Sequence, residues 1–107
     1  MTTFDKRKDA AEAKFAHDEE TQFKVMARRD KLVGLWAAEK LGLSGDAAAA
    51  YAKTVVMADM EVPGDSDVIA KLAADFAAKK ISVSQSDIEH ALHEKMIMAE
   101  SQINAEA

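Results

Sequence analysis

Helical periodicity, broken at only a few points, is the feature that most constrains the fold of this 107-residue chain. Apolar side chains recur every three or four residues over long segments, which is the spacing of one face of an α-helix. Strand signals are nearly absent, because the two β-branched clusters, 54–56 and 81–83, are each too short to predict a strand. The pattern therefore predicts an all-α fold.

Helix-stop residues divide the chain into four predicted helices. Gly42 suits the left-handed position after a helix end, and Leu43 can pack back on the last turn as in a Schellman motif. Pro63-Gly64 ends the second helix. The expected bounds are 3–41, 45–62, 66–80 and a last helix from about residue 84. Four helices joined by short turns predict an antiparallel four-helix bundle.

The start of the last helix carries two overlapping capping signals. Ser84 with Asp87 forms a capping box, in which each residue hydrogen-bonds the backbone N–H of the other. Ser86 with Glu89 makes an equally good box. The sequence therefore leaves the start of this helix open by two residues.

The first helical segment is uneven. From Phe23 onward it has a predicted core face, formed by Phe23, Met26, Leu32, Val33, Leu35, Trp36 and Ala37. Residues 1–22 instead hold ten charged side chains, and only Phe4 and Phe15 are large apolar residues after the first methionine. These two aromatic residues share one helical face, but so thin a stripe cannot hold a helix against a bundle. We expect residues 1–22 to form a helix-prone arm that is mobile or disordered when free, and residues 23–107 to form the bundle.

Charge and composition argue against several classes of function. The formal net charge of -5 argues against a nucleic-acid partner, and the absence of cysteine removes disulfides, thiol catalysis and Cys-ligated zinc. No apolar run approaches the roughly 20 residues of a membrane span, and the charged N-terminal segment lacks the apolar region of a signal peptide. We expect a cytoplasmic protein that is monomeric when free and does not insert into a membrane directly.

Candidate catalytic and metal-binding groups are few. His90 and His93 are three residues apart on a predicted helix and can approach one metal ion, but a third ligand is not evident. The acidic pairs lie at a helix end and in a turn, where Asp commonly caps helices: Asp59 with Glu61, and Asp65 with Asp67. No Gly-rich phosphate loop is present. The sequence predicts a protein that is not an enzyme, with no metal site and no required cofactor.

Two basic clusters and six methionines remain to be interpreted. The cluster Lys6-Arg7-Lys8 belongs to the arm, and we favour a functional role for it because the bundle cannot retain the arm. The cluster at 28–31 is interpreted as a solvated charged face. The methionines are interpreted as side chains that fill the core, in preference to a promiscuous binding groove.

Three segments of the chain resemble a known family. They are MTTFDKRKDAAEAKFAHDEETQFK, ARRDKLVGLWAAEKLGL and AYAKTVVMADMEVPGDSDV. In order and spacing they are similar to the zeta subunit family of alpha-proteobacterial F-type ATP synthases. The resemblance covers most of the chain, and EAKFAHDEE, GLWAAE-x-LG and EVPGDSDV are its most specific motifs.

The resemblance implies a concrete function. Zeta subunits resemble four-helix bundles with an N-terminal arm, and they inhibit ATP hydrolysis by the F1 sector of ATP synthase. The arm is inserted at a catalytic α/β interface near the rotor. The candidate partner-binding residues are those in the matching arm segment: Phe4, Arg7, Ala11, Lys14, Phe15, His17 and Asp18. We expect Phe4 and Phe15 to be apolar anchors, and Arg7 and Lys14 to pair with acids on the enzyme.

The resemblance also implies an alternative function, and the sequence departs from the family pattern at three positions. Its members bind adenine nucleotide weakly, so a helical ATP- or ADP-binding sensor is the alternative function, with a site that the sequence does not place. Asp30 stands where the family pattern has Asn, and Met60 and Val62 stand where it has Phe and Glu. These three positions lie in the bundle, outside the arm.

Overall fold

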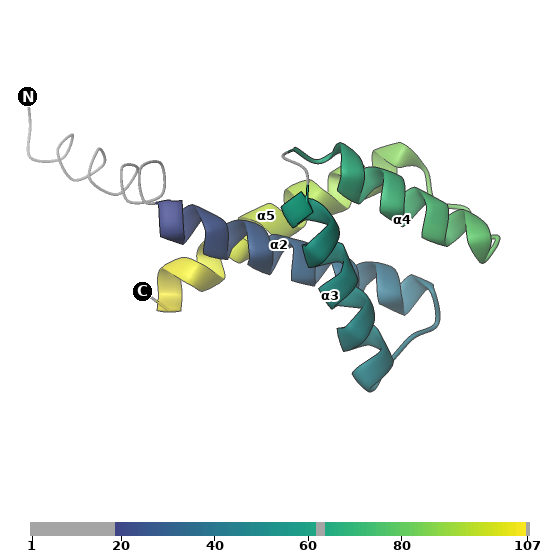
Figure 1. Cartoon of the computed structure of the whole chain (residues 1–107), viewed down its shortest axis with the longest axis horizontal. Helices are drawn as coiled ribbons and strands as arrows, with labels where there is room; N and C mark the ends of the chain where they lie inside the picture. Colours follow the sequence, from purple (N-terminus) through teal and green to yellow (C-terminus); the bar gives the residue numbers. More distant parts are fainter. Residues whose placement is uncertain (1–18, 62–63, 107) are drawn as a thin grey trace, which may run out of the picture.

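The computed structural model describes residues 19–61 and 64–106, and these residues form four helices (Figure 1). The helices are α2 (Glu19–Lys40), α3 (Gly45–Glu61), α4 (Ser66–Ala78) and α5 (Gln85–Glu106). The prediction of an all-α four-helix fold is confirmed. The end of α2, both ends of α3 and α4, and the start of α5 lie within two residues of their expected positions. The predicted arm falls mostly outside the described residues, so its mobility stays a prediction.

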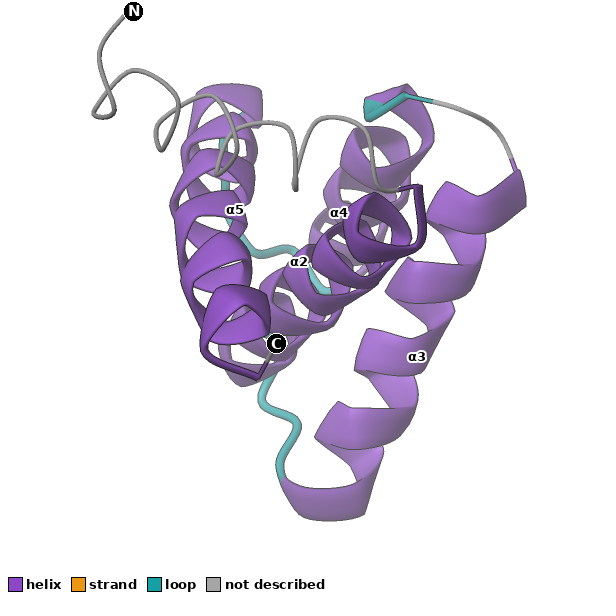
Figure 2. Ribbon diagram, turned by 90° about the vertical axis from the view of Figure 1, so that its left-hand side faces the viewer, coloured by secondary structure: helices purple, strands orange, loops and turns teal. Residues whose placement is uncertain are grey.

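Helix α2 is the central element of the bundle. It packs against α3 on one side and α5 on the other, while α4 contacts α3 and α5 (Figure 2). Helix α5 runs back along α2 in the opposite direction. Accordingly Arg28, in the first half of α2, donates a 2.8 Å hydrogen bond to Gln102 and pairs with Glu106 at the end of α5.

The buried side chains form two clusters. The larger one gathers residues from all four helices around Phe76, and the ring of Trp36 stands edge-on to Phe76 with 5.9 Å between centroids. The smaller one joins Val25 of α2 to Ala99 and Ile103 of α5. No described side chain before Val25 is buried. The first turn of α2 therefore extends beyond the core.

The end of α2 has the predicted Schellman geometry. Gly42 has a φ of 81°, in the left-handed region that favours glycine. The N–H of Leu43 donates to the carbonyl of Ala38 at 2.8 Å, and that of Gly42 donates to Glu39 at 3.1 Å. Both bonds satisfy carbonyls at the end of the helix, which turns the chain sharply toward α3.

The capping box at the start of α5 settles the alternative that the sequence left open. The N–H of Asp87 donates to the Ser84 hydroxyl at 3.0 Å, and the N–H of Ser84 donates to the Asp87 carboxylate at 3.2 Å. The hydrogen bond that the Ser84 N–H donates to the carboxylate, with a further contribution from the Ser84 side chain, lowers the pKa of Asp87. The box of Ser84 and Asp87 is thus the one that forms, and α5 begins at Gln85.

Two predictions about the core are wrong. Phe23, assigned to the core face, is 56% exposed, and Met57, Met60 and Met98 are 58%, 61% and 41% exposed. The error at Phe23 has a geometric cause. Val25 is buried, and a residue two positions earlier lies about 200° around the helix, on the opposite side. The three exposed methionines lie at the surface and do not fill the core.

Candidate functional site

The predicted partner-binding residues lie outside the described residues. They are Phe4, Arg7, Ala11, Lys14, Phe15, His17 and Asp18, and their roles stay predictions. The structure does describe where the arm would join the bundle. Helix α2 opens with Glu19 and Glu20, where the helix dipole favours acidic side chains, and Glu20 pairs with Lys24 at 3.5 Å.

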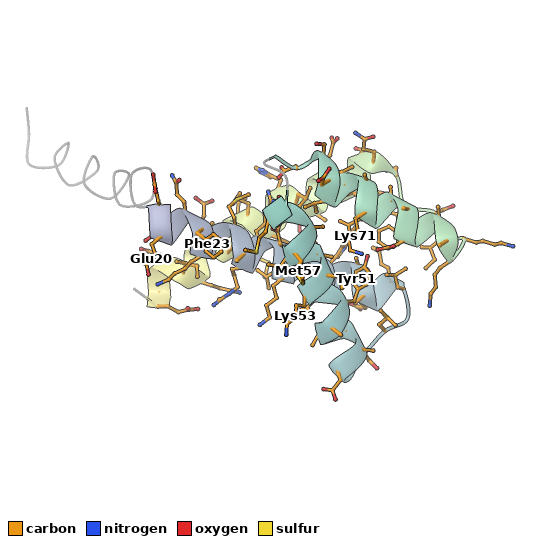
Figure 3. The ribbon with its side chains drawn as sticks, in the orientation of Figure 1. Glu20, Phe23, Tyr51, Lys53, Met57 and Lys71 are labelled. Atoms are coloured by element: carbon orange, nitrogen blue, oxygen red, sulfur yellow. The ribbon has the colours of Figure 1, made fainter. Side chains whose placement is uncertain are left out.

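A shallow apolar groove lies between α2 and α3, next to this junction. It has a volume of about 240 Å³. Its lining is mostly apolar and also includes two acids: Phe23, Met26, Ala27 and Asp30 of α2, and Val56, Asp59 and Met60 of α3. Figure 3 shows Phe23 on α2 and Met57 on the neighbouring α3. Large exposed apolar side chains gathered in one place often mark an interaction site. The groove is therefore the strongest candidate interaction surface among the described residues.

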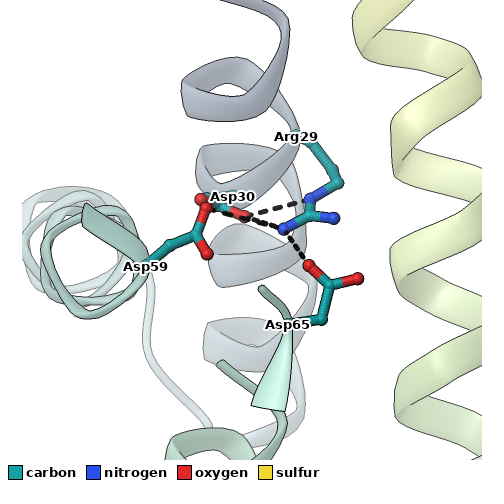
Figure 4. A network of polar contacts seen from close by, with 4 residues as sticks. All are labelled: Arg29, Asp30, Asp59 and Asp65. Carbon is teal, nitrogen blue, oxygen red and sulfur yellow. Dashed lines mark hydrogen bonds and ion pairs between the residues drawn. The ribbon is translucent and has the colours of Figure 1, made fainter. Parts of the chain in front are cut away.

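A buried polar network lies beneath this groove. Figure 4 shows the guanidinium of Arg29 between three carboxyl groups. Its Nη2 is 2.8 Å from Asp30 Oδ1, 2.9 Å from Asp65 Oδ1 and 3.7 Å from Asp59 Oδ2. The network joins α2 to the end of α3 and to the start of α4. One cation thus holds three segments of the chain together.

Charge balance makes Asp30 the unusual member of the network. Burial, together with a hydrogen bond with Asp59, raises its pKa to about 8 against the opposing effect of Arg29. Burial lowers the pKa of Arg29, but the hydrogen bonds with Asp65 and Asp30 outweigh it and the pKa rises. At neutral pH a protonated Asp30 can donate to the carboxylate of Asp59 and accept from Arg29.

This network corrects the interpretation of residues 28–31 as a solvated face. Arg29 and Asp30 are only 2% and 1% exposed. The expectation that Asp65 caps a helix holds for its position but not for its side chain. It occupies the N-cap position of α4 without a side-chain capping bond, because its carboxylate pairs with Arg29. The spacing of residues along the helix could have predicted the burial of Arg29, since Arg29 stands four residues after Val25 and four before Val33.

Replacing Asp30 by Asn, the residue of the family pattern, should stabilise the protein above pH 7. An amide can donate to Asp59 and accept from Arg29 without a titrating proton. Because the pKa of Asp30 is raised in the folded state, the native protein binds the extra proton, and its stability falls as pH rises from about 4 to 8. Asp30→Asn should remove this loss, a gain of about 2 kcal/mol or more at pH 8 and little at pH 4.

Urea denaturation between pH 4 and 9 measures this effect. Glu100→Gln, which neutralises an exposed carboxylate on α5, is the matched control and should leave the pH dependence unchanged. Equal curves for Asp30→Asn and the unsubstituted chain across this range would contradict the raised pKa of Asp30.

A second cavity, between the end of α2 and the start of α5, bears on nucleotide binding. It has a volume of about 280 Å³, and Trp36, Lys40, Asp87, Glu94 and Lys95 are among its lining residues. The ammonium of Lys40 lies 5.3 Å from the centroid of the Trp36 ring. An aromatic face and two lysines suit a purine and its phosphates, whereas the two carboxylates repel phosphate. The volume lies below the usual range of about 300–1,000 Å³ for ligand pockets, which favours weak binding at most.

The histidine pair does not assemble into a metal centre in the described part of the chain. His90 is exposed and pairs with Glu94 one turn later on α5. Within residues 19–61 and 64–106, no group of three His, Cys, Asp or Glu side chains could hold a metal ion. A search of the same residues also finds no helix that is long and apolar enough to cross a membrane.

Comparisons with known proteins identify the family. No curated protein matches the chain. A protein with a solution NMR structure is 43% identical, with a TM-score of 0.71, over 80% of this chain and 98% of its own length. The family model described as ATPase inhibitor subunit zeta matches residues 1–102 and so includes both the arm and most of the bundle. The chain therefore belongs to the ATPase inhibitor subunit zeta family, which indicates a regulatory role at the ATP synthase.

Proposed function

We propose that the protein inhibits ATP hydrolysis by inserting its N-terminal arm at a catalytic α/β interface of F1, near the rotor. The observation that carries this proposal is the extent of the family match, which begins at residue 1 and includes the whole arm. An inhibitor that acts from this position prevents rotation, and it needs no catalytic group of its own.

The distribution of buried side chains in α2 supports separate roles for the arm and the bundle. The first buried side chain in the described residues is Val25, and the core clusters draw on nothing earlier. Among the described residues, the core clusters therefore begin at Val25. The arm is proposed to bind a partner with its own side chains, and its ordering on that partner would be coupled to binding.

Within the arm, Phe4 and Phe15 are proposed to be buried in F1, with Arg7 and Lys14 pairing with acidic side chains. Aromatic side chains in desolvated pockets dominate the energy of most interfaces, while charged side chains at the rim mainly guide association. Ala11 lies between the two aromatic residues in sequence, and its small side chain allows close approach of the partner. His17 and Asp18 complete the proposed contact segment.

Deleting residues 1–18 tests the proposal. The remaining chain should keep its fold and its unfolding midpoint, because every core side chain of the described residues is retained. Its inhibition of F1-ATPase should fall more than about 100-fold, since the anchors of the interface are lost. A double substitution, Phe4→Ser with Phe15→Ser, should have nearly the same effect in the full chain. Ile97→Ser, which alters an exposed apolar residue on α5, is the control. Full inhibition by the shortened chain would refute this mechanism.

Weak adenine-nucleotide binding is the second proposal, and the cavity beside Trp36 supports it. ATP at millimolar concentration should then shift the backbone amide signals of Trp36, Lys40 and Lys95 in NMR spectra of the free protein. The signals of α3 should stay in place, because none of its residues is among those that line this cavity. Unchanged spectra would remove the nucleotide proposal without affecting the proposed inhibition.

A further inference from the structure

The surface formed by α2 and α3 carries an apolar patch with a positive rim, here called the α2–α3 face. Its apolar part is Phe23, Met57 and Met60, each more than half exposed, around the groove described above. Its rim is Lys31 and Lys53, both exposed. We propose that this face binds an amphipathic helix with acidic flanks on the F1 sector, beside the interface that receives the arm.

The charge of the rim points to an acidic partner. Lys31 and Lys53 have no ion-pair partner among the described residues, and they are the two such lysines that border the apolar patch. Four further described lysines without an ion pair belong to other parts of the surface: Lys40, Lys79, Lys80 and Lys95. The chain as a whole carries a formal net charge of -5, whereas the rim of this patch carries two lysines whose charge an acidic partner can neutralise. Opposite charges around an apolar patch fix the orientation of a partner and speed its association.

The shape of the face suits a helix. Lys31 follows the groove residue Ala27 by one turn of α2, and Lys53 precedes Met57 by one turn of α3 (Figure 3). Both lysines thus continue the apolar patch along the two helices that form the groove. A groove between two helices accepts the apolar ridge of a third, with side chains three and four residues apart as anchors.

The position of the face points to the protein that holds the arm. This step rests on the proposed function. Phe23 follows Asp18 by five residues, and five residues of chain span at most about 18 Å. Any surface that binds the arm up to residue 18 therefore lies close to Phe23. Phe23, the largest exposed aromatic side chain of the described residues, thus lies next to the surface that binds the arm.

Methionine oxidation of the full chain tests the proposal with a built-in control. In the free protein, Met57, Met60 and Met98 should react with hydrogen peroxide at comparable rates, because all three are exposed. In the complex with F1, Met57 and Met60 should become at least about 10-fold less reactive, since burial excludes the oxidant. Met98 lies on α5, on the other side of α2, and should change less than about twofold.

Affinity measurements give a second, independent readout. Met57→Glu should weaken binding to F1 by about 30-fold, because it places a charge in a desolvated apolar contact. Ile97→Glu introduces the same charge at an equally exposed apolar residue of α5 and should change affinity less than about twofold. Lys53→Glu should weaken binding mainly at low salt, while Lys79→Glu at the end of α4 should not.

The outcomes separate this proposal from the proposed function. Inhibition by the full chain without protection of Met57 and Met60 would overturn the docking face alone, whereas absence of any inhibition would refute the proposed function. Slow oxidation of Met57 in the free protein would also overturn the docking face, because another segment or molecule would already cover it. If deleting residues 1–18 restored fast oxidation, the arm would be the occupant. If dilution restored it, a second copy of the chain would be.

Discussion

Replacing Arg29 by methionine should lower the free energy of unfolding by about 3–5 kcal/mol at pH 7, because the substitution removes the buried cation that pairs with Asp30, Asp59 and the half-exposed Asp65. The aliphatic part of the side chain is retained, so the loss is electrostatic. A domain of this size is stable by only about 5–15 kcal/mol, and much of the protein should unfold at low urea concentration. Circular dichroism during urea denaturation measures the effect.

The neighbouring arginine provides the control. Arg28→Met removes the same charge from the same helix, but Arg28 is partly exposed and pairs with Glu106 at the surface. Such pairs contribute at most about 1 kcal/mol, so Arg28→Met should cost far less. Equal losses for the two arginine variants would show that the cluster does not depend on its cation.

The fold could be predicted from the sequence because its determinants are local. Gly42 and the box of Ser84 with Asp87 act within one turn of helix, through bonds to nearby backbone groups. Such signals do not depend on what the helix packs against. This is why the end of α2 and the start of α5 were predicted within two residues, although the packing of the helices on one another was not.

The buried network and the α2–α3 face could not be predicted, because both depend on which side of α2 faces its neighbours. Choosing the face that contains Phe23 placed Arg29 at the surface, while the structure buries the row that includes Val25 and Arg29. Burial of a charged residue becomes favourable only when partners from other segments arrive, here Asp59 and Asp65. Residue types along one helix contain no direct record of these partners.

Gly34 is the second position at which a small change should have a large effect. It lies in the middle of α2, where glycine costs about 1 kcal/mol relative to alanine by helix propensity alone. The structure explains why it is tolerated. A Cβ atom at this position would lie 2.6 Å from the Cα of Ala52 and 2.9 Å from its Cβ. Glycine thus allows the backbones of α2 and α3 to approach closely where the two helices cross.

Gly34→Ala should therefore destabilise the protein by about 2 kcal/mol despite its better helix propensity, because overpacking a close contact costs more than the propensity returns. The shift should be visible in the urea midpoint and in weaker binding of F1 through the α2–α3 face, whose two helices would be forced apart. An increase in stability would show that the crossing is loose.

Testing Gly34→Ala in a second variant, Ala52→Gly, identifies which atom of Ala52 clashes with the added Cβ. Ala52→Gly removes the methyl group but leaves the Cα, which is the nearest neighbour of the added carbon. Gly34→Ala should consequently still lower stability when it is introduced into Ala52→Gly, though by less than in the unsubstituted chain. Full relief in that background would mean that only the methyl group resists the added carbon. Persistent loss would locate the constraint in the backbone of α3, where no change of side chain can relieve it.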